Sequence, residues 1–247
     1  MSLNKVAITE VVKKQFRYKL KANVGVFTSL VILQIIGLLF ALGGNGGGSH
    51  HIAEVEISYT LYSIYNTIVF ITLWALIHAT LMTKKNTEDT FSFVANNLTK
   101  DLSNIVFLTF ASIIAAILTV LSAFSLRVIV HFFIGEDLLS RTTYTLTGGE
   151  VLSAIIVMTF ILLFVCDIGY FLGTVSRLHS LLPRLLPVVI IGGFIGLERM
   201  NPGWIETIIS FYYQESNLFL YLLKMMLTLI ILFSFSIFLS SRTEVRI

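Results

Sequence analysis

The chain has 247 residues, of which 56% are hydrophobic and only 13% are charged, and its mean hydropathy is +0.88. Soluble domains carry about 25% charged residues, so this composition excludes an ordinary soluble domain and indicates a protein whose main solvent is lipid. The formal charge of +3 is small and the basic residues flank apolar segments, which argues against a nucleic-acid surface. The single cysteine, Cys166, excludes a disulfide framework within the chain.

Six apolar stretches are candidates for crossing a bilayer core, which takes about 17 to 25 helical residues. They are residues 24–42, 60–82, 105–133, 151–175, 182–197 and 218–239. The fifth stretch is short and contains Arg184 and Pro187, but Pro183 suits the first turn of a helix, where its missing N–H does no harm. We therefore expect an all-α, polytopic membrane protein with one domain, 1–247, and six transmembrane helices.

The distribution of lysine and arginine predicts the orientation of these spans. If the N-terminus is cytoplasmic, 13 of the 17 basic residues fall on the cytoplasmic side. Those residues are Lys5, Lys13, Lys14, Arg17, Lys19, Lys21, Lys84, Lys85, Lys100, Arg177, Arg184, Arg242 and Arg246. The positive-inside rule then predicts a plasma-membrane protein with both termini in the cytoplasm, and a first apolar stretch that is retained as a span.

The segment before the first span, residues 1–23, has the pattern of an interfacial amphipathic helix. Apolar side chains recur every fourth residue at Ile8, Val12, Phe16 and Leu20, and basic side chains gather on the opposite face. Lys19 interrupts the apolar arc, although a lysine stem can reach outward from such a position. The alternative is a positively charged leader that only orients the first span.

A second amphipathic segment lies in the cytoplasmic connection 83–104. Acidic residues follow a candidate cap at Thr87, and Phe91, Val94 and Leu98 fall on one helical face. Asn96-Asn97 offers a stop signal. This pattern predicts a short helix lying across the cytoplasmic surface. The alternative is a helical hairpin that packs on lipid headgroups.

The first outer loop contains a glycine-rich run, residues 43–48, followed by His50 and His51. The glycine density predicts a flexible linker. The run also lacks the spacing of a phosphate-binding loop. The two histidines with Glu54 and Glu56 are a weak candidate for a metal site, since adjacent histidines in a loop seldom form a fixed one.

The later part of the chain carries two further signals. Gly192 and Gly196 have the GxxxG spacing that lets transmembrane helices approach closely, within the chain or across a dimer. Residues 204–213 are apolar and aromatic but too few to span, so we expect a short helix lying in the outer leaflet.

Charged residues inside spans are functional candidates by default. Asp167 lies deep in the fourth span, whereas Lys224 lies only six residues into the sixth. The difference in depth argues against a direct ion pair. We expect Lys224 to reach outward and Asp167 either to bind a neighbouring helix or to line a translocation path.

The sequence lacks the residue constellations that catalysis needs. It has no HExxH zinc motif, no GxSxG nucleophile elbow and no Walker lysine with its acidic partner. We expect no enzymatic activity and no cofactor or metal in this chain, so energy for transport has to come from another chain or from a gradient.

The order of these parts resembles the type-2 family of ATP-binding-cassette (ABC) transporter permeases. The closest likeness is to small permeases of Gram-positive bacteria that export antimicrobial or cytolytic peptides, such as the staphylococcal exporters of phenol-soluble modulins. The residues that carry the likeness are 14–23 (KQFRYKLKAN), 89–98 (DTFSFVANNL) and 102–105 (LSNI).

The resemblance implies a dimer of six-span subunits, with a second copy or a paralogue, each resting on a soluble ATPase chain that binds ATP and Mg²⁺. It implies that the N-terminal amphipathic segment is an elbow helix, with contacts through Val12, Phe16, Arg17 and Leu20. It also implies that 88–98 is a coupling helix seated in the ATPase. Its contact residues would be Lys84, Lys85, Glu88, Asp89, Phe91, Phe93, Val94 and Leu98.

The cargo implied by the resemblance is an amphipathic peptide or a lipid-like molecule. Two other functions fit the same spans. The first is a stand-alone immunity or sensor protein in the membrane that intercepts peptides without pumping. The second is a gradient-driven carrier, although intramembrane acidic residues are sparse for that role.

Overall fold

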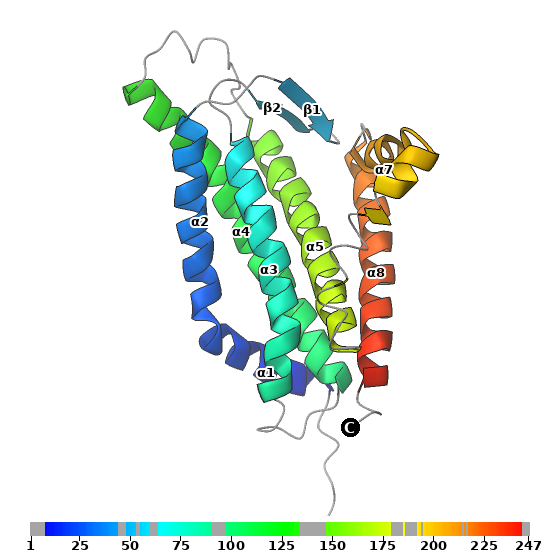
Figure 1. Cartoon of the computed structure of the whole chain (residues 1–247). Coiled ribbons are helices and arrows are strands. Elements are labelled where there is room, and N and C mark those ends of the chain that lie inside the picture. The colour runs from blue at the N-terminus through cyan, green and yellow to red at the C-terminus, as the bar shows by residue number, and fades with distance from the viewer. Residues whose placement is uncertain are drawn as a thin grey trace, which may run out of the picture.

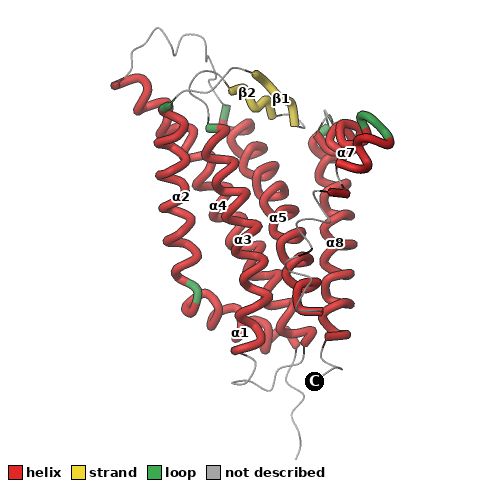
Figure 2. Tube along the Cα trace, viewed as in Figure 1, coloured by secondary structure: helices red, strands yellow, loops and turns green. Residues whose placement is uncertain are grey.

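The computed structural model describes residues 8–43, 48–52, 55–59, 64–89, 97–133, 147–178, 185, 192–193, 195–213, 215 and 217–243. Within them the chain is a bundle of long helices with a small hairpin at one end (Figures 1 and 2). Five helices are long and apolar enough to cross a membrane. They are α2 (Val24–Leu42), α3 (Tyr65–Asp89), α4 (Asn97–Phe133), α5 (Gly148–Leu178) and α8 (Leu218–Thr243). The prediction of a helical membrane protein is confirmed, with helices in five of the six predicted places.

The two ends of the bundle are built differently (Figure 1). At one end, which we call the base, α1 (Ile8–Ala22) lies across the bundle and packs on the first turns of α4, at the end where α3, α5 and α8 finish. At the opposite end, which we call the apex, lie the strands β1 (Gly48–Ile52) and β2 (Val55–Tyr59) and the helix α7 (Trp204–Tyr213). The described chain therefore begins and ends at the base.

A backbone bend at Asn23 turns the chain from α1 into α2. The Asn23 side chain donates to the carbonyl of Lys19 (3.0 Å), and its backbone N–H donates to the same carbonyl (2.9 Å). The last turn of α1 is thus closed by a polar side chain, which satisfies a carbonyl that the helix end leaves unpaired. This local chemistry lets α1 lie across the end of the bundle while α2 runs along it.

The loop after α2 is more ordered than predicted. We expected a flexible linker in an all-α chain, but β1 and β2 form an antiparallel hairpin in which Gly48 pairs with Tyr59 and Ile52 with Val55. The β-branched and aromatic residues at these positions favour extended backbone, and the glycine count had hidden that signal. The central part of the glycine run, 44–47, lies outside the described residues.

Close helix packing is concentrated on α5. A Cβ on Gly169 would lie 2.5 Å from the carbonyl oxygen of Leu76, and one on Gly173 would lie 2.9 Å from that of Thr80. The Thr80 hydroxyl donates to the carbonyl of Gly169 (3.0 Å), so α3 and α5 are also joined by a hydrogen bond. Gly169 and Gly173 have the GxxxG spacing, and small residues at that spacing let two helix backbones approach.

The glycines chosen from the sequence for this role, Gly192 and Gly196, do not pack in this way. A Cβ on either one would have no atom within 4 Å. The spacing occurs twice in the predicted spans, and of these two pairs the one in α5 makes the close contact among the described residues, while a contact of Gly192 and Gly196 across a dimer stays a prediction.

Two predicted segments lie largely outside the described residues. Of the fifth predicted span, 182–197, only 185, 192–193 and 195–197 are described, all as helix. In the connection 83–104, α3 continues to Asp89 and α4 already begins at Asn97, so both helices reach further into this segment than predicted. Residues 90–96, which hold most of the expected coupling helix, are not described.

Candidate functional site

A buried lysine joins α1 to α4 at the base. The side chain of Lys19 is only 9% exposed, and its amine donates to the carbonyl oxygen of Lys100 (3.2 Å), to Ser103 Oγ (2.5 Å) and to Asn104 Oδ1. An ammonium group has three hydrogens, and each one has an acceptor here. Lys19 therefore does not reach outward, as its position in the apolar arc had suggested; it anchors α1 on the first turns of α4.

The same asparagine continues the contact to α5. Asn104 Nδ2 donates to the hydroxyl oxygen of Tyr170 (3.2 Å), and that hydroxyl donates to Asp101 Oδ1 (2.7 Å). Asp101, Asn104 and Tyr170 are all 1% exposed or less. Lys19, Asp101, Ser103, Asn104 and Tyr170 form what we call the base junction, a buried hydrogen-bonded cluster that connects α1, α4 and α5.

The helical period explains why these residues meet. Asp101 and Asn104 are three residues apart and so lie on one face of α4, while Lys19 follows Phe16 by three residues on α1. The Phe16 ring packs edge-on against Phe110 of α4, with centroids 5.7 Å apart. The apolar face of α1 thus rests on α4 and brings the lysine onto the polar face beside it.

The predicted elbow-helix residues divide between this contact and the surface. Phe16 and Leu20 pack against the hydrophobic core and Val12 is half-buried, whereas Arg17 is exposed. The apolar arc of α1 is therefore used partly on the protein itself. Its first residue, Ile8, remains 59% exposed.

Five of the eight predicted coupling residues are described, and they lie at the base on either side of residues 90–96. The backbone places Lys84, Lys85, Glu88 and Asp89 in the last turns of α3. Leu98 lies in the first turn of α4 and is 51% exposed. The three remaining predicted contacts, at Phe91, Phe93 and Val94, are outside the described residues.

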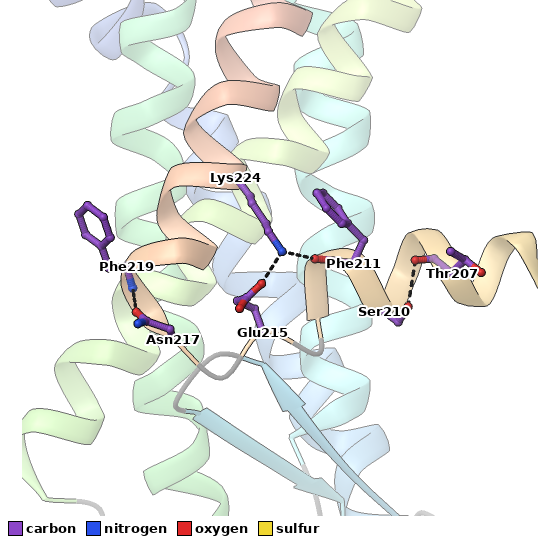
Figure 3. Close-up of polar contacts among 7 residues, drawn as sticks. All are labelled: Thr207, Ser210, Phe211, Glu215, Asn217, Phe219 and Lys224. Carbon is purple, nitrogen blue, oxygen red and sulfur yellow. Dashed lines mark hydrogen bonds and ion pairs between the residues drawn. The ribbon is translucent and has the colours of Figure 1, made fainter.

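Lys224 lies near the apex, in a contact that does not include Asp167. Its amine forms an ion pair with Glu215, donates to the carbonyl oxygen of Phe211 (3.1 Å) and sits 4.1 Å from the centroid of the Phe211 ring (Figure 3). This contact, which we call the apex clamp, holds the last turn of α7 on α8. The Asn217 side chain accepts a hydrogen bond from the N–H of Phe219 (2.9 Å) and caps the start of α8.

Asp167 is fully buried in α5, and neither carboxylate oxygen has a hydrogen-bond partner within the described part of the chain. The Tyr170 and Phe233 rings, with centroids 6.3 Å apart, set the register between α5 and α8. Lys224 lies nine residues from Phe233 toward the apex, and Asp167 lies three residues from Tyr170 in the same direction. The two charged residues therefore differ in depth by about 9 Å along the helix axis. The structure thus does not bring together the two charged residues that the sequence singled out.

The base junction was not predicted as a site. Its one visible signal was Lys19, a charged residue on an apolar face, and its other members are ordinary polar residues in or near spans. Among the described residues, no group of three or more histidine, cysteine, aspartate or glutamate side chains is placed to hold a metal ion. The side chains of the histidine pair in β1 are outside the described part.

Comparison of the chain with family models, curated proteins and solved structures finds no match.

Proposed function

We propose that this chain is the membrane-spanning permease subunit of an ATP-driven exporter of the ABC type, working with a separate ATPase chain. The observation that carries the proposal is the construction of the base. Helices α3 and α4 reach it on either side of the 90–96 stretch, and α1 is anchored there to α4 by Lys19. A partner that moves this stretch would move two transmembrane helices directly.

The length of α4 supports a role in transmitting such a movement. Its 37 residues extend about 55 Å, compared with about 30 Å for the hydrocarbon core of a bilayer. Part of the helix therefore projects beyond the membrane. Because the base junction ties its first turns to α1 and α5, a push at the base is carried into the bundle as a rigid-body movement.

We propose six spans with both termini in the cytoplasm. Helix α5 descends from the apex to the base, and α7 and the start of α8 lie at the apex (Figure 1). The chain between Leu178 and Trp204 has to return from base to apex. That return is the place where the sequence predicts the fifth span, and it makes the number of crossings even, in agreement with the distribution of basic residues.

We further propose that the cargo is an amphipathic peptide or a lipid-like molecule and that the working unit contains a second permease copy or a paralogue. Helix α3 keeps an apolar stripe exposed along its length. Its members are Tyr65, Val69, Leu73, Ile77 and Leu81. Such a stripe suits lipid, apolar cargo or another subunit, and it offers no charge to select a hydrophilic solute.

The decisive experiment is purification of the tagged chain from its native membranes, followed by identification of ATPases that come with it. We expect an ABC ATPase to co-purify with the native chain and to be lost in Phe91→Asp. The matched control is Phe132→Asp, which changes an exposed phenylalanine at the apex end of α4. Retention of the ATPase by Phe91→Asp, or its equal loss in both variants, would refute the coupling assignment.

A functional arm separates the permease from an immunity or sensor protein. Cells that express the chain are challenged with membrane-active peptides before and after every ABC ATPase of the cell is inactivated by mutation of its Walker lysine. Export predicts that resistance disappears with ATPase activity. Resistance that persists unchanged would favour a protein that intercepts peptides without pumping them.

A further inference from the structure

Polar side chains lie along one face of α5 from Asp167 toward the base, and two of them, Asp167 and Arg177, have buried polar atoms without a partner among the described residues. The positions Asp167, Tyr170, Thr174 and Arg177 are spaced by three, four and three residues, which places them on one side of the helix. Asp167, Tyr170 and Thr174 are each at most 1% exposed. The Nε and Nη2 atoms of Arg177 are buried without a hydrogen-bond partner, as are both oxygens of Asp167.

Contacts on either side show where this face points. Cys166 and Tyr170 contact α4, through Ser112 (3.6 Å) and Asn104 (3.2 Å) respectively. Phe171 faces α8, where its ring lies 5.8 Å from that of Phe235. At 3.6 residues per turn, Asp167 and Thr174 fall between these two directions. They therefore face the seam where α4 and α8 meet against α5.

The other two helices contribute similar groups to the seam. On α4, Asp101 leaves its second oxygen, Oδ2, buried and unpaired below the Tyr170 hydroxyl bond. On α8, Ser236 is fully buried and its hydroxyl has no partner within the described residues. Ser236 follows Phe233 by one turn, which places it at the level of Thr174. Three helices thus direct unpaired polar atoms into one seam.

Unpaired polar atoms buried within a membrane protein cost free energy of folding. An unsatisfied buried polar group is destabilising by about 1–3 kcal/mol, and charged groups cost more. Within hydrocarbon these groups are tolerated where they bind one another or line a water-filled cavity. Among the described residues, the seam groups bond to one another at the Asp101–Tyr170–Asn104 contact and through the Thr174 hydroxyl, which donates to the Tyr170 carbonyl (2.9 Å). Water, which both donates and accepts, suits a mixture of carboxyl, guanidinium and hydroxyl groups.

We propose that the seam between α4, α5 and α8, which is closed in this structure, opens at the base to form a water-filled inlet that ends at Asp167. In the open inlet Arg177 lies at the mouth, Asp101, Thr174 and Ser236 line the middle, and the Asp167 carboxyl is the deepest group that the water reaches. The inlet does not require a particular energy source or cargo, so it stands apart from the proposed function.

The test is the reactivity of single cysteines toward a charged, membrane-impermeant methanethiosulfonate reagent. Cys166 is first replaced by alanine, and Ser236→Cys is introduced into that background in lipid nanodiscs, with labelling measured by intact mass. Two matched serines on the same helices give the controls. Ser234→Cys is on the exposed face of α8, and Ser112→Cys is fully buried in α4 outside the seam.

We expect Ser236→Cys to be labelled at least ten times faster than both controls, because only a hydrated thiol ionises and meets the reagent. Thr174→Cys is the second position, for use if Ser236→Cys does not fold, and the same rate is expected there. The proposal would be overturned if, in the folded protein, a seam thiol were labelled as slowly as Ser112→Cys and reacted only after denaturation. None of these readouts depends on an ATPase, so a dry seam would leave the permease proposal standing.

Discussion

The base and the apex each hold an accessory helix against the transmembrane bundle with one lysine, but they do so in opposite ways. At the base, Lys19 is buried and binds three neutral oxygens of α4. At the apex, the Lys224 and Glu215 side chains are 24% and 22% exposed and form an ion pair beside the Phe211 ring (Figure 3). One contact is enclosed and the other is open to solvent.

This difference separates permanent from adjustable attachment. A buried amine whose acceptors are also buried cannot exchange them for water, so opening the contact strands several polar groups at once. A partly exposed ion pair can be replaced by hydrated ions at small cost. We therefore expect α1 to move together with α4, and α7 to detach from α8 far more easily.

The largest effect is expected for Lys19→Met, which keeps most of the side-chain volume and removes the amine. The change leaves Ser103 Oγ, Asn104 Oδ1 and the Lys100 carbonyl without this donor, and we expect a loss of about 3 kcal/mol in the free energy of unfolding. Thermal unfolding of the protein in nanodiscs measures it. Lys21→Met, on the exposed face of the same helix, is the control and should change the melting temperature by less than about one degree.

A double variant checks the cause of that loss. Lys19→Met combined with Asn104→Leu removes both the donor and its main acceptor, so the two changes should be clearly less than additive. Additive losses would mean that Lys19 stabilises the base through its stem alone.

The next effect in size is expected for Gly173→Leu, at the tight contact between α3 and α5. A side chain there would meet the Thr80 carbonyl and the Thr83 side chain, so the helices must separate, at a cost of about 1–3 kcal/mol. Gly25→Leu is the matched control, because a Cβ on Gly25 in α2 meets no atom within 4 Å. Equal melting temperatures for the two variants would show that α3 and α5 are not closely packed in the membrane.

The α3–α5 contact and the base junction show which features a sequence can and cannot predict. Span length and hydropathy depend on the residues of one segment, so α2, α3, α4, α5 and α8 were predicted close to their observed positions. The GxxxG spacing is also local, but its partner is not, and the pattern alone did not distinguish Gly169 and Gly173 from Gly192 and Gly196. Which of two equal patterns packs depends on the rotation of each helix, which the neighbouring helices set.

The base junction illustrates the same limit for polar groups. Lys19 and Tyr170 are 151 positions apart along the chain, and Asn104 joins them only because α1, α4 and α5 meet at the base. Each residue taken alone fits a bland interpretation: an outward-reaching lysine, an asparagine at a helix start, a tyrosine near the membrane surface. Their common site is a property of the tertiary structure, and no local spacing encodes it.

The smallest effect is expected at the apex, for Lys224→Met. Loss of a partly exposed ion pair and of one cation–π contact should cost about 0.5–1 kcal/mol, and that loss should appear as local detachment of α7 with little change in global unfolding. Hydrogen exchange of the α7 amides measures the detachment. Exchange there should become faster, whereas exchange in α1 should stay the same; the reverse pattern is expected for Lys19→Met. If both variants loosened both helices, base and apex would form one cooperative unit, and the division between a fixed α1 and a releasable α7 would fail.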